Sequence, residues 1–247
     1  MITLQSTPKQ IRQELDEDEK KALYWFIKQK HGEKGYNNWR IEQCKRLYNQ
    51  PEKKELFSEP VEYNSKNGNR WLVYEHTSRD GEGGLFTFTY SVCYFETYES
   101  VGAYVRMDAE SGEDGKMIPG CIFYTPHFFQ RFAERIGIEY RSRTMMLRFL
   151  QLAHHHLVMD KKKKRDGFKD IEIVMRYPAS YAFGTRRVVD GYQMVTVRTF
   201  LPVTMMTPTR KKELEEYGIF SDKYMDYFAK ERLKSLSTEI HIPIYKK

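Results

Sequence analysis

The sequence predicts an α+β fold: a largely antiparallel sheet packed by two central helices, with a helical N-terminal section and C-terminal helices. Three observations lead to this prediction. Apolar residues recur at helical spacing up to about residue 57, they alternate with polar residues from Asn69 onward, and two helical patterns interrupt that alternation after residue 124. Grouped helices and strands that do not alternate strictly are typical of α+β proteins.

The composition is that of a folded protein with a basic surface. Aromatic residues make up 15% of the chain, mostly Tyr and Phe, which favours half-buried sheets and stacking surfaces. The net charge of +7 is compatible with an anionic partner, and solubility accounts for a charge of this size equally well. Three isolated cysteines predict no disulfide framework, and neither a signal peptide nor a membrane-spanning apolar run is recognisable. We therefore expect a cytoplasmic protein without a membrane partner.

Residues 1–60 are expected to form the helical section. Thr7-Pro8 is typical of a capped helix start, Gly32 and Gly35 are expected to end a helix, and Pro51 a later one. Helical spacing gives way to strand spacing near residues 58–68. We therefore expect residues 61–247 to form the α+β domain, either separate from residues 1–60 or continuous with them.

Strands are expected wherever the period of the apolar residues is two. In the longest of them, Phe86 and Phe88 are expected on the buried face, while Thr87 and Thr89 face the wetter side. Asp190-Gly191 suits a type I′ hairpin turn. The expected strands cover residues 70–76, 85–98, 101–108, 116–124, 170–177, 180–189 and 192–201, and helices 209–217 and from 221 precede a short edge strand at 239–245.

The stretch from Tyr124 to Gly137 reads as one short helix with a start, two faces and a stop. Thr125 is the candidate N-cap, followed by a proline at the first helical position, and Gly137 suits the C-terminal end. Phe129, Phe132, Ala133 and Ile136 gather on one side. The other side carries His127, Arg131, Glu134 and Arg135. That set suits acid/base chemistry and phosphate binding, and it is equally typical of a solvated helix face.

A longer helix is expected from Ser142 to about Leu157, with Met146 and Leu150 on its buried stripe. Its end carries three consecutive histidines, His154 to His156. Consecutive helical residues diverge by about 100°, so no two of them form the i, i+4 pair that metal sites use. We predict no metal site, with metal binding by this run as the lesser alternative.

Two further groups of cations are candidates for phosphate contacts. The first is the basic run from Lys161 to Arg165, in which Lys163 and Arg165 are the candidates. The second lies on the hairpin of residues 180–201. If Phe183 faces Arg198 in that hairpin, one sheet face carries Thr185, Arg187, Thr196 and Arg198. An ordinary solvated loop and sheet face explain both groups as well.

Between residue 124 and about residue 205 the expected order is helix, helix, strand, strand, strand. The first helix carries His127-x3-Arg131-x3-Arg135, and the last strand carries Val195-Thr-Val-Arg-Thr199. This layout, over about a third of the chain, resembles the barnase, colicin and RelE-type ribonuclease toxin superfamily and the small phage and mobile-element domains grouped with it.

The resemblance implies metal-independent cleavage of RNA without a cofactor, in which the 2′-OH attacks the neighbouring phosphate. The helix dipole favours the neutral imidazole of His127, which would then act as general base. Glu134 is the alternative general base. Phosphate contacts would come from Arg131, Arg135, Arg187 and Arg198, and a hydroxyl from Thr196 or Thr199. RNA and an inhibitor protein are the expected partners. A non-catalytic module that binds a protein or a nucleic acid is the alternative, and the oligomeric state stays open.

Overall fold

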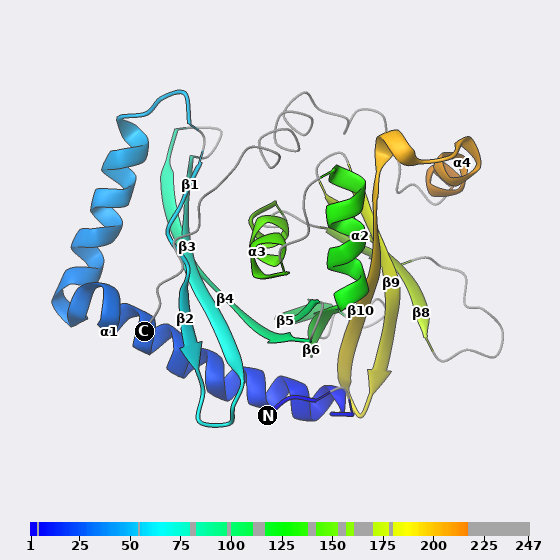
Figure 1. Ribbon diagram of the computed structural model, residues 1–247, viewed down its shortest axis with the longest axis horizontal. Helices are drawn as coiled ribbons and strands as arrows, with labels where there is room; N and C mark the ends of the chain where they lie inside the picture. Colours follow the sequence, from blue (N-terminus) through cyan, green and yellow to red (C-terminus); the bar gives the residue numbers. More distant parts are fainter. Residues whose placement is uncertain are drawn as a thin grey trace. The chain divides into compact units, whose positions relative to one another are not determined.

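The computed structural model in Figure 1 describes the chain except residues 4, 54, 80–82, 98–99, 111–116, 138–141, 153–156, 161–169, 178–179 and 217–247. For residues 30, 31, 33, 34 and 157–160 and at a few strand or helix ends, only the backbone is described. The chain forms two compact units, Met1–Phe95 and Glu96–Lys247. Helices and mostly antiparallel strands confirm the α+β class. Among the described residues, no helix is both long and apolar enough to cross a membrane.

The first unit begins with the long helix α1, Pro8–Tyr48. The Thr7 hydroxyl accepts from the backbone N–H of Gln10, and the Gln10 side chain accepts from the Thr7 N–H, which completes a capping box. The helix is kinked at Gly32, which has a positive φ of 60°, and Figure 1 draws α1 as a bent ribbon. The helix end predicted at Gly32 is confirmed, because the non-helical backbone of this glycine divides α1 into two helical segments.

Three strands pair antiparallel with the central strand of this unit, β3, Arg70–Arg79. They are β1, Glu55–Phe57, β2, Val61–Asn64, and β4, Leu85–Glu96. The first two were not predicted, because three or four residues are too few to show an alternation. The change from helical to strand spacing near residue 60 lies inside the first unit.

The start of β4 faces the opposite way from the prediction. Thr87 is 6% exposed, whereas Phe86 and Phe88 are 49% and 52% exposed. The prediction was wrong because α1 covers the threonine face with polar groups of its own. The Tyr36 hydroxyl lies 2.8 Å from Thr89 Oγ1, and the Arg40 guanidinium donates to the Thr87 carbonyl. Paired in this way, the threonines tolerate burial.

The second unit has the strand order β5-β6-β10-β9-β8-β7. Neighbouring strands are antiparallel except β6 and β10, which are parallel. Asp190 and Gly191 have φ of 53° and 75°, as a type I′ turn between β9 and β10 requires. The strands are β5, Val101–Glu110, β6, Met117–Tyr124, β7, Leu157–Asp160, β8, Ile171–Tyr177, β9, Ser180–Val189, and β10, Tyr192–Pro202.

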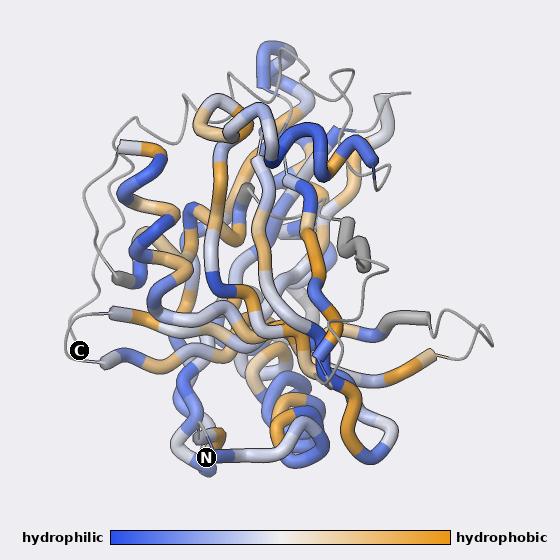
Figure 2. The backbone as a smooth tube through the Cα atoms, turned by 90° about the vertical axis from the view of Figure 1, so that its right-hand side faces the viewer, coloured by the Kyte–Doolittle hydropathy of each residue, from blue (hydrophilic) through white to orange (hydrophobic). Residues whose placement is uncertain are grey.

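Three helices belong to the second unit: α2, Pro126–Ile136, α3, Ser142–Leu152, and α4, Pro208–Glu216. The expected continuation of α3 to Leu157 was wrong, because Leu157 begins β7 and pairs with β8. A 3-10 turn, Val203–Met205, leads from β10 towards α4. Figure 2 shows hydrophobic and hydrophilic colours alternating within single strands and helices, as elements with one buried face require.

Aromatic rings fill the space between α2, α3 and β10. Phe149 of α3 lies edge-on to Phe128 at 4.7 Å and to Phe132 at 5.3 Å between ring centroids, and Phe132 lies 4.9 Å from Phe200 of β10. Edge-to-face contacts of this kind add about 0.5–1.5 kcal/mol each beyond the area they bury. The predicted burial of Phe129 and Phe132 on α2 is confirmed, and Leu150 is buried as expected.

The hydroxyls of Tyr124 and Tyr177 meet at 3.2 Å beside this cluster, and both side chains are buried. Burial raises the pKa of both phenols, and the neighbouring Tyr124 adds to the effect on Tyr177. The fold therefore requires both tyrosines to stay neutral.

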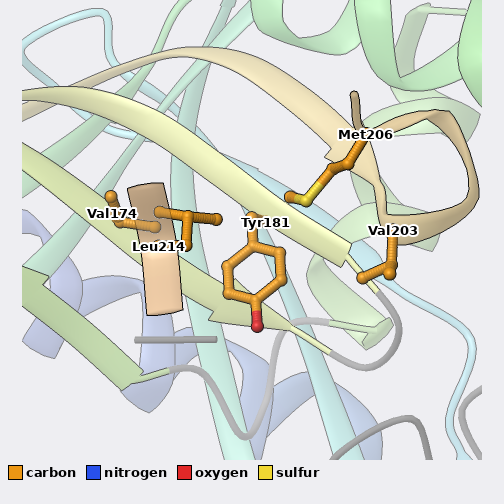
Figure 3. Close-up of a cluster of buried hydrophobic side chains, with 5 residues drawn as sticks. All are labelled: Val174, Tyr181, Val203, Met206 and Leu214. Carbon is orange, nitrogen blue, oxygen red and sulfur yellow. The ribbon is translucent and has the colours of Figure 1, made fainter. Parts of the chain in front are cut away.

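A second apolar cluster lies on the other face of the β8–β10 strands, under α4 (Figure 3). Tyr181 belongs to it, whereas the next residue of β9, Ala182, pairs with Phe200 on the side of α2. Both faces of this end of the sheet are thus covered. The cluster consists of Val174, Tyr181, Val203, Met206 and Leu214.

Replacing Phe132 with alanine should lower the free energy of unfolding by about 3–5 kcal/mol, because it removes a fully buried ring from a cluster that cannot collapse around the gap. Val188→Ala, at a position that is 47% exposed, is the control and should change stability by less than about 0.5 kcal/mol. Urea unfolding measures both values. Equal losses for the two variants would contradict the packing described.

The tyrosine pair predicts a loss of stability at alkaline pH. A group whose folded pKa is raised stabilises the fold fully below its unfolded pKa, about 10, and this contribution is lost as the pH rises further. Above pH ~10 each tyrosine should lower the free energy of unfolding by up to about 1.4 kcal/mol per pH unit. Urea unfolding between pH 8 and 11 should show a shallower decline for Tyr124→Phe/Tyr177→Phe than for wild type. Parallel declines would rule out the pair as the cause.

Candidate phosphate-binding site

The start of α2 is attached to β10 by the residue that caps it. The Thr125 hydroxyl accepts from the backbone N–H of Phe128 at 3.2 Å. Its own N–H and hydroxyl each donate to the Val197 carbonyl at 3.1 Å. The parallel ladder between β6 and β10 ends at the pair Tyr124 and Val197, so α2 begins where the ladder stops. Gly137 ends the helix in the left-handed conformation, as predicted.

Three of the predicted residues meet on the exposed face of α2. Arg131 Nε donates to His127 Nε2 at 3.3 Å, and Arg131 Nη1 lies 2.7 Å from Glu134 Oε2. The first contact requires Nε2 of His127 to be unprotonated, because only a neutral imidazole nitrogen accepts a hydrogen bond. Exposed pairs of this kind contribute less than about 1 kcal/mol to stability. A ligand with a stronger demand for the Arg131 guanidinium can therefore rearrange them.

Arg135, one turn further on, points towards β10 instead. Its Nη1 donates to Thr199 Oγ1 at 3.2 Å and to the Phe200 carbonyl. Partial burial lowers the pKa of Arg135 and the nearby Arg131 cation lowers it further, while Glu134 opposes both effects. A guanidinium stays charged nonetheless. Arg135 thus supplies a fixed positive charge between the helix and the strand.

A β-bulge decides which residues of β10 reach this helix. The register of β9 and β10 shifts between Val197 and Thr199, so Arg198 is the extra residue and Phe183 pairs with Thr199. The predicted pairing of Phe183 with Arg198 was therefore wrong. The pairs before the bulge are as predicted: Val189 with Tyr192, Arg187 with Met194, and Thr185 with Thr196.

The register also separates two predicted residues from the rest. Phe200 pairs with Ala182 of β9, and the rings of α2 pack on Phe200, so α2 lies on the face that the even-numbered residues of β9 occupy. Arg187 is an odd-numbered residue of β9 and belongs to the opposite face. Thr196 belongs to that face as well, because it pairs with Thr185. Arg187 is bound there by Asp170, at 2.6 Å from Nε and 3.0 Å from Nη2. The structure therefore does not bring Thr196 and Arg187 together with His127.

Thr199 contacts α2 through Arg135, and Arg198 precedes it in the chain. Arg198 is exposed and directly follows Val197, whose carbonyl holds the helix cap. Thr199, held by Arg135, replaces Thr196 as the hydroxyl nearest the helix. The spacing of the apolar residues Val195, Val197 and Phe200 carries the missed signal. It changes from two to three where the bulge lies.

Other candidates from the sequence lie outside the described residues: Lys163, Arg165 and the run His154 to His156. Within the described part of the chain, no group of three or more His, Cys, Asp or Glu side chains could hold a metal ion. Comparisons with protein-family models, with curated proteins and with solved structures found no match. The function is therefore inferred from the chemistry of the α2 face.

The two neighbouring arginines of α2 should respond differently to truncation. Arg135→Ala should lower the free energy of unfolding by about 1.5–3 kcal/mol, because it leaves the Thr199 hydroxyl and the Phe200 carbonyl without their charged donor. Arg131→Ala, at an exposed ion pair, should cost less than about 1 kcal/mol. Urea unfolding of both variants provides the comparison. A larger loss for Arg131→Ala would show that the anchor has been assigned to the wrong residue.

Proposed function

We propose that the α2 face binds a phosphodiester of RNA and cleaves it without a metal ion. The observation that carries the proposal is the contact of Arg131 Nε with Nε2 of His127 on an exposed helix face. It joins a nitrogen that can accept a proton to a guanidinium that can hold an anion. The resemblance of residues 124–205 to ribonuclease toxins supports the same chemistry.

Binding of the phosphate by Arg131 frees His127, the general base, from its hydrogen bond with Arg131. A guanidinium binds a phosphate through two charge-assisted hydrogen bonds, which are stronger than its exposed contact with a neutral imidazole. When Arg131 turns to the phosphate, Nε2 of His127 becomes available as a proton acceptor. Glu134, at 2.7 Å from Arg131, keeps the guanidinium at the helix surface.

The proposed reaction is the attack of the ribose 2′-oxygen on phosphorus. The 2′-oxygen forms a bond to phosphorus, its proton passes to His127, and the bond to the 5′-oxygen breaks, leaving a cyclic phosphate. The leaving 5′-oxygen takes a proton from water. The cations of Arg131, Arg135 and Arg198 balance the negative charge that grows on the phosphate oxygens. Thr196 and Arg187 have no part in this step.

His127→Ala should reduce RNA cleavage by about 10²–10⁴-fold, the loss expected when a general base is removed. Arg187→Ala is the matched control, an exposed arginine on the other sheet face, and should cleave like wild type. EDTA should leave the rate unchanged. The assay follows a labelled RNA on a denaturing gel, with circular dichroism to show that each variant is folded.

Three results would contradict the proposal. Cleavage that survives His127→Ala removes this histidine from the mechanism, and cleavage that EDTA abolishes indicates a metal-dependent nuclease. Wild-type protein that binds RNA and leaves it intact favours the alternative function, a non-catalytic module that binds nucleic acid.

A further inference from the structure

Two phenylalanines at the start of β4 expose about half of their surface. Phe86 and Phe88 stand two residues apart on one face of the strand, with ring centroids 6.5 Å apart and an interplanar angle of 23°. Phe88 lies 6.5 Å from Tyr90, and Tyr90 stacks on Tyr74 at 5.8 Å. An exposed aromatic row of this kind is a common feature of binding surfaces.

The rings cannot turn inward, because the register of β4 is fixed by its other face. Thr87 Oγ1 lies 2.9 Å from Thr77 Oγ1 of β3, and Arg40 of α1 donates to the Thr87 carbonyl. A one-residue slip that buried the rings would expose these paired hydroxyls. The phenylalanine side chains are therefore held on the face of β4 that the Thr87 hydroxyl does not occupy.

A pocket of about 610 Å³ opens between α1 and the start of β4. Phe86 and Phe88 line it together with the exposed Tyr48, and the charged residues of its lining are Arg40 and Lys45. None of the described lining residues is acidic. Lys45 pairs at 2.8 Å with Glu42, an exposed contact that contributes little to stability and is easily exchanged for another anion.

We propose that this pocket and the Phe86–Phe88 rings bind single-stranded nucleic acid. Aromatic side chains that stack on bases, together with cations that contact the backbone, are the means by which proteins hold single strands without reading their sequence. Charge decides between this ligand and a protein partner. Interfaces between proteins are depleted of charged residues at their centre, whereas Arg40 and Lys45 border the same pocket as Phe86 and Phe88 here.

The inference is independent of the chemistry proposed for α2. Base stacking does not need a 2′-OH, so single-stranded DNA should bind as RNA does. DNA also resists cleavage by 2′-oxygen attack, so binding can be measured apart from catalysis.

The test measures fluorescence anisotropy of a labelled oligothymidylate titrated with the full-length protein. Phe86→Ala and Phe88→Ala should each weaken binding by roughly 5- to 150-fold, the loss expected for one stacked base. Lys45→Gln should reduce the dependence of log K on log salt by about 0.7 for each phosphate lost. Tyr24→Ala, at an α1 position that is 57% exposed and outside the described lining, should bind like wild type.

The proposal fails if wild-type protein does not bind the oligonucleotide at low salt, or if both phenylalanine variants bind as tightly as wild type. Sedimentation velocity tests a second copy of the chain as the occupant. A dimer that forms without oligonucleotide and is lost in Phe86→Ala and Phe88→Ala would assign the rings to self-association and overturn the proposal. Failure of the cleavage experiment on α2 would leave this result unaffected.

Discussion

The second unit depends on the edge-to-face packing of Phe149 against the rings of α2 and β10. This packing fixes which side of α2 faces inward, and the polar side can only point outward. Two further attachments, Thr125 to the Val197 carbonyl and Arg135 to the Phe200 carbonyl, tie both ends of the helix to the same strand. His127 and Arg131 are therefore displayed on a rigid element, as a preorganised site requires.

The three arginines predicted to contact phosphate from α2 and β9 have different environments. Arg131 lies on the surface with weak partners, Arg135 is anchored against β10, and Arg187 is bound by Asp170 on the opposite sheet face. Burial and partners explain the difference, because a desolvated guanidinium that satisfies a carbonyl is costly to move and an exposed one is not. Arg131 and Arg187 both have exposed side chains, and of these two only Arg131 lies beside His127.

Much of the fold was predictable from local sequence signals. The caps at Thr7 and Thr125, the left-handed Gly137 and the Asp190-Gly191 turn each depend on residues that are neighbours in the chain. The failures depend on contacts between distant segments. The facing of Phe86 and Thr87 is decided by α1, and β7 forms because β8 offers it a partner.

The candidate site was predictable to the same extent. Residues three or four apart on one helix, such as His127, Arg131 and Glu134, meet because helix geometry alone brings them together. The contribution of the sheet was mispredicted by one residue, and one residue is enough to move a side chain to the other face. That residue is Arg198, the extra residue of the bulge.

The bulge adds one residue to β10 without changing the face of the residues on either side of it. Deleting Arg198 would remove the extra residue and leave an ordinary ladder, in which Thr199 still pairs with Phe183 and Phe200 with Ala182. Both apolar layers would keep their side chains. For anyone who redesigns this strand, Arg198 is therefore a position at which the chain can be shortened without turning its neighbours to the other face.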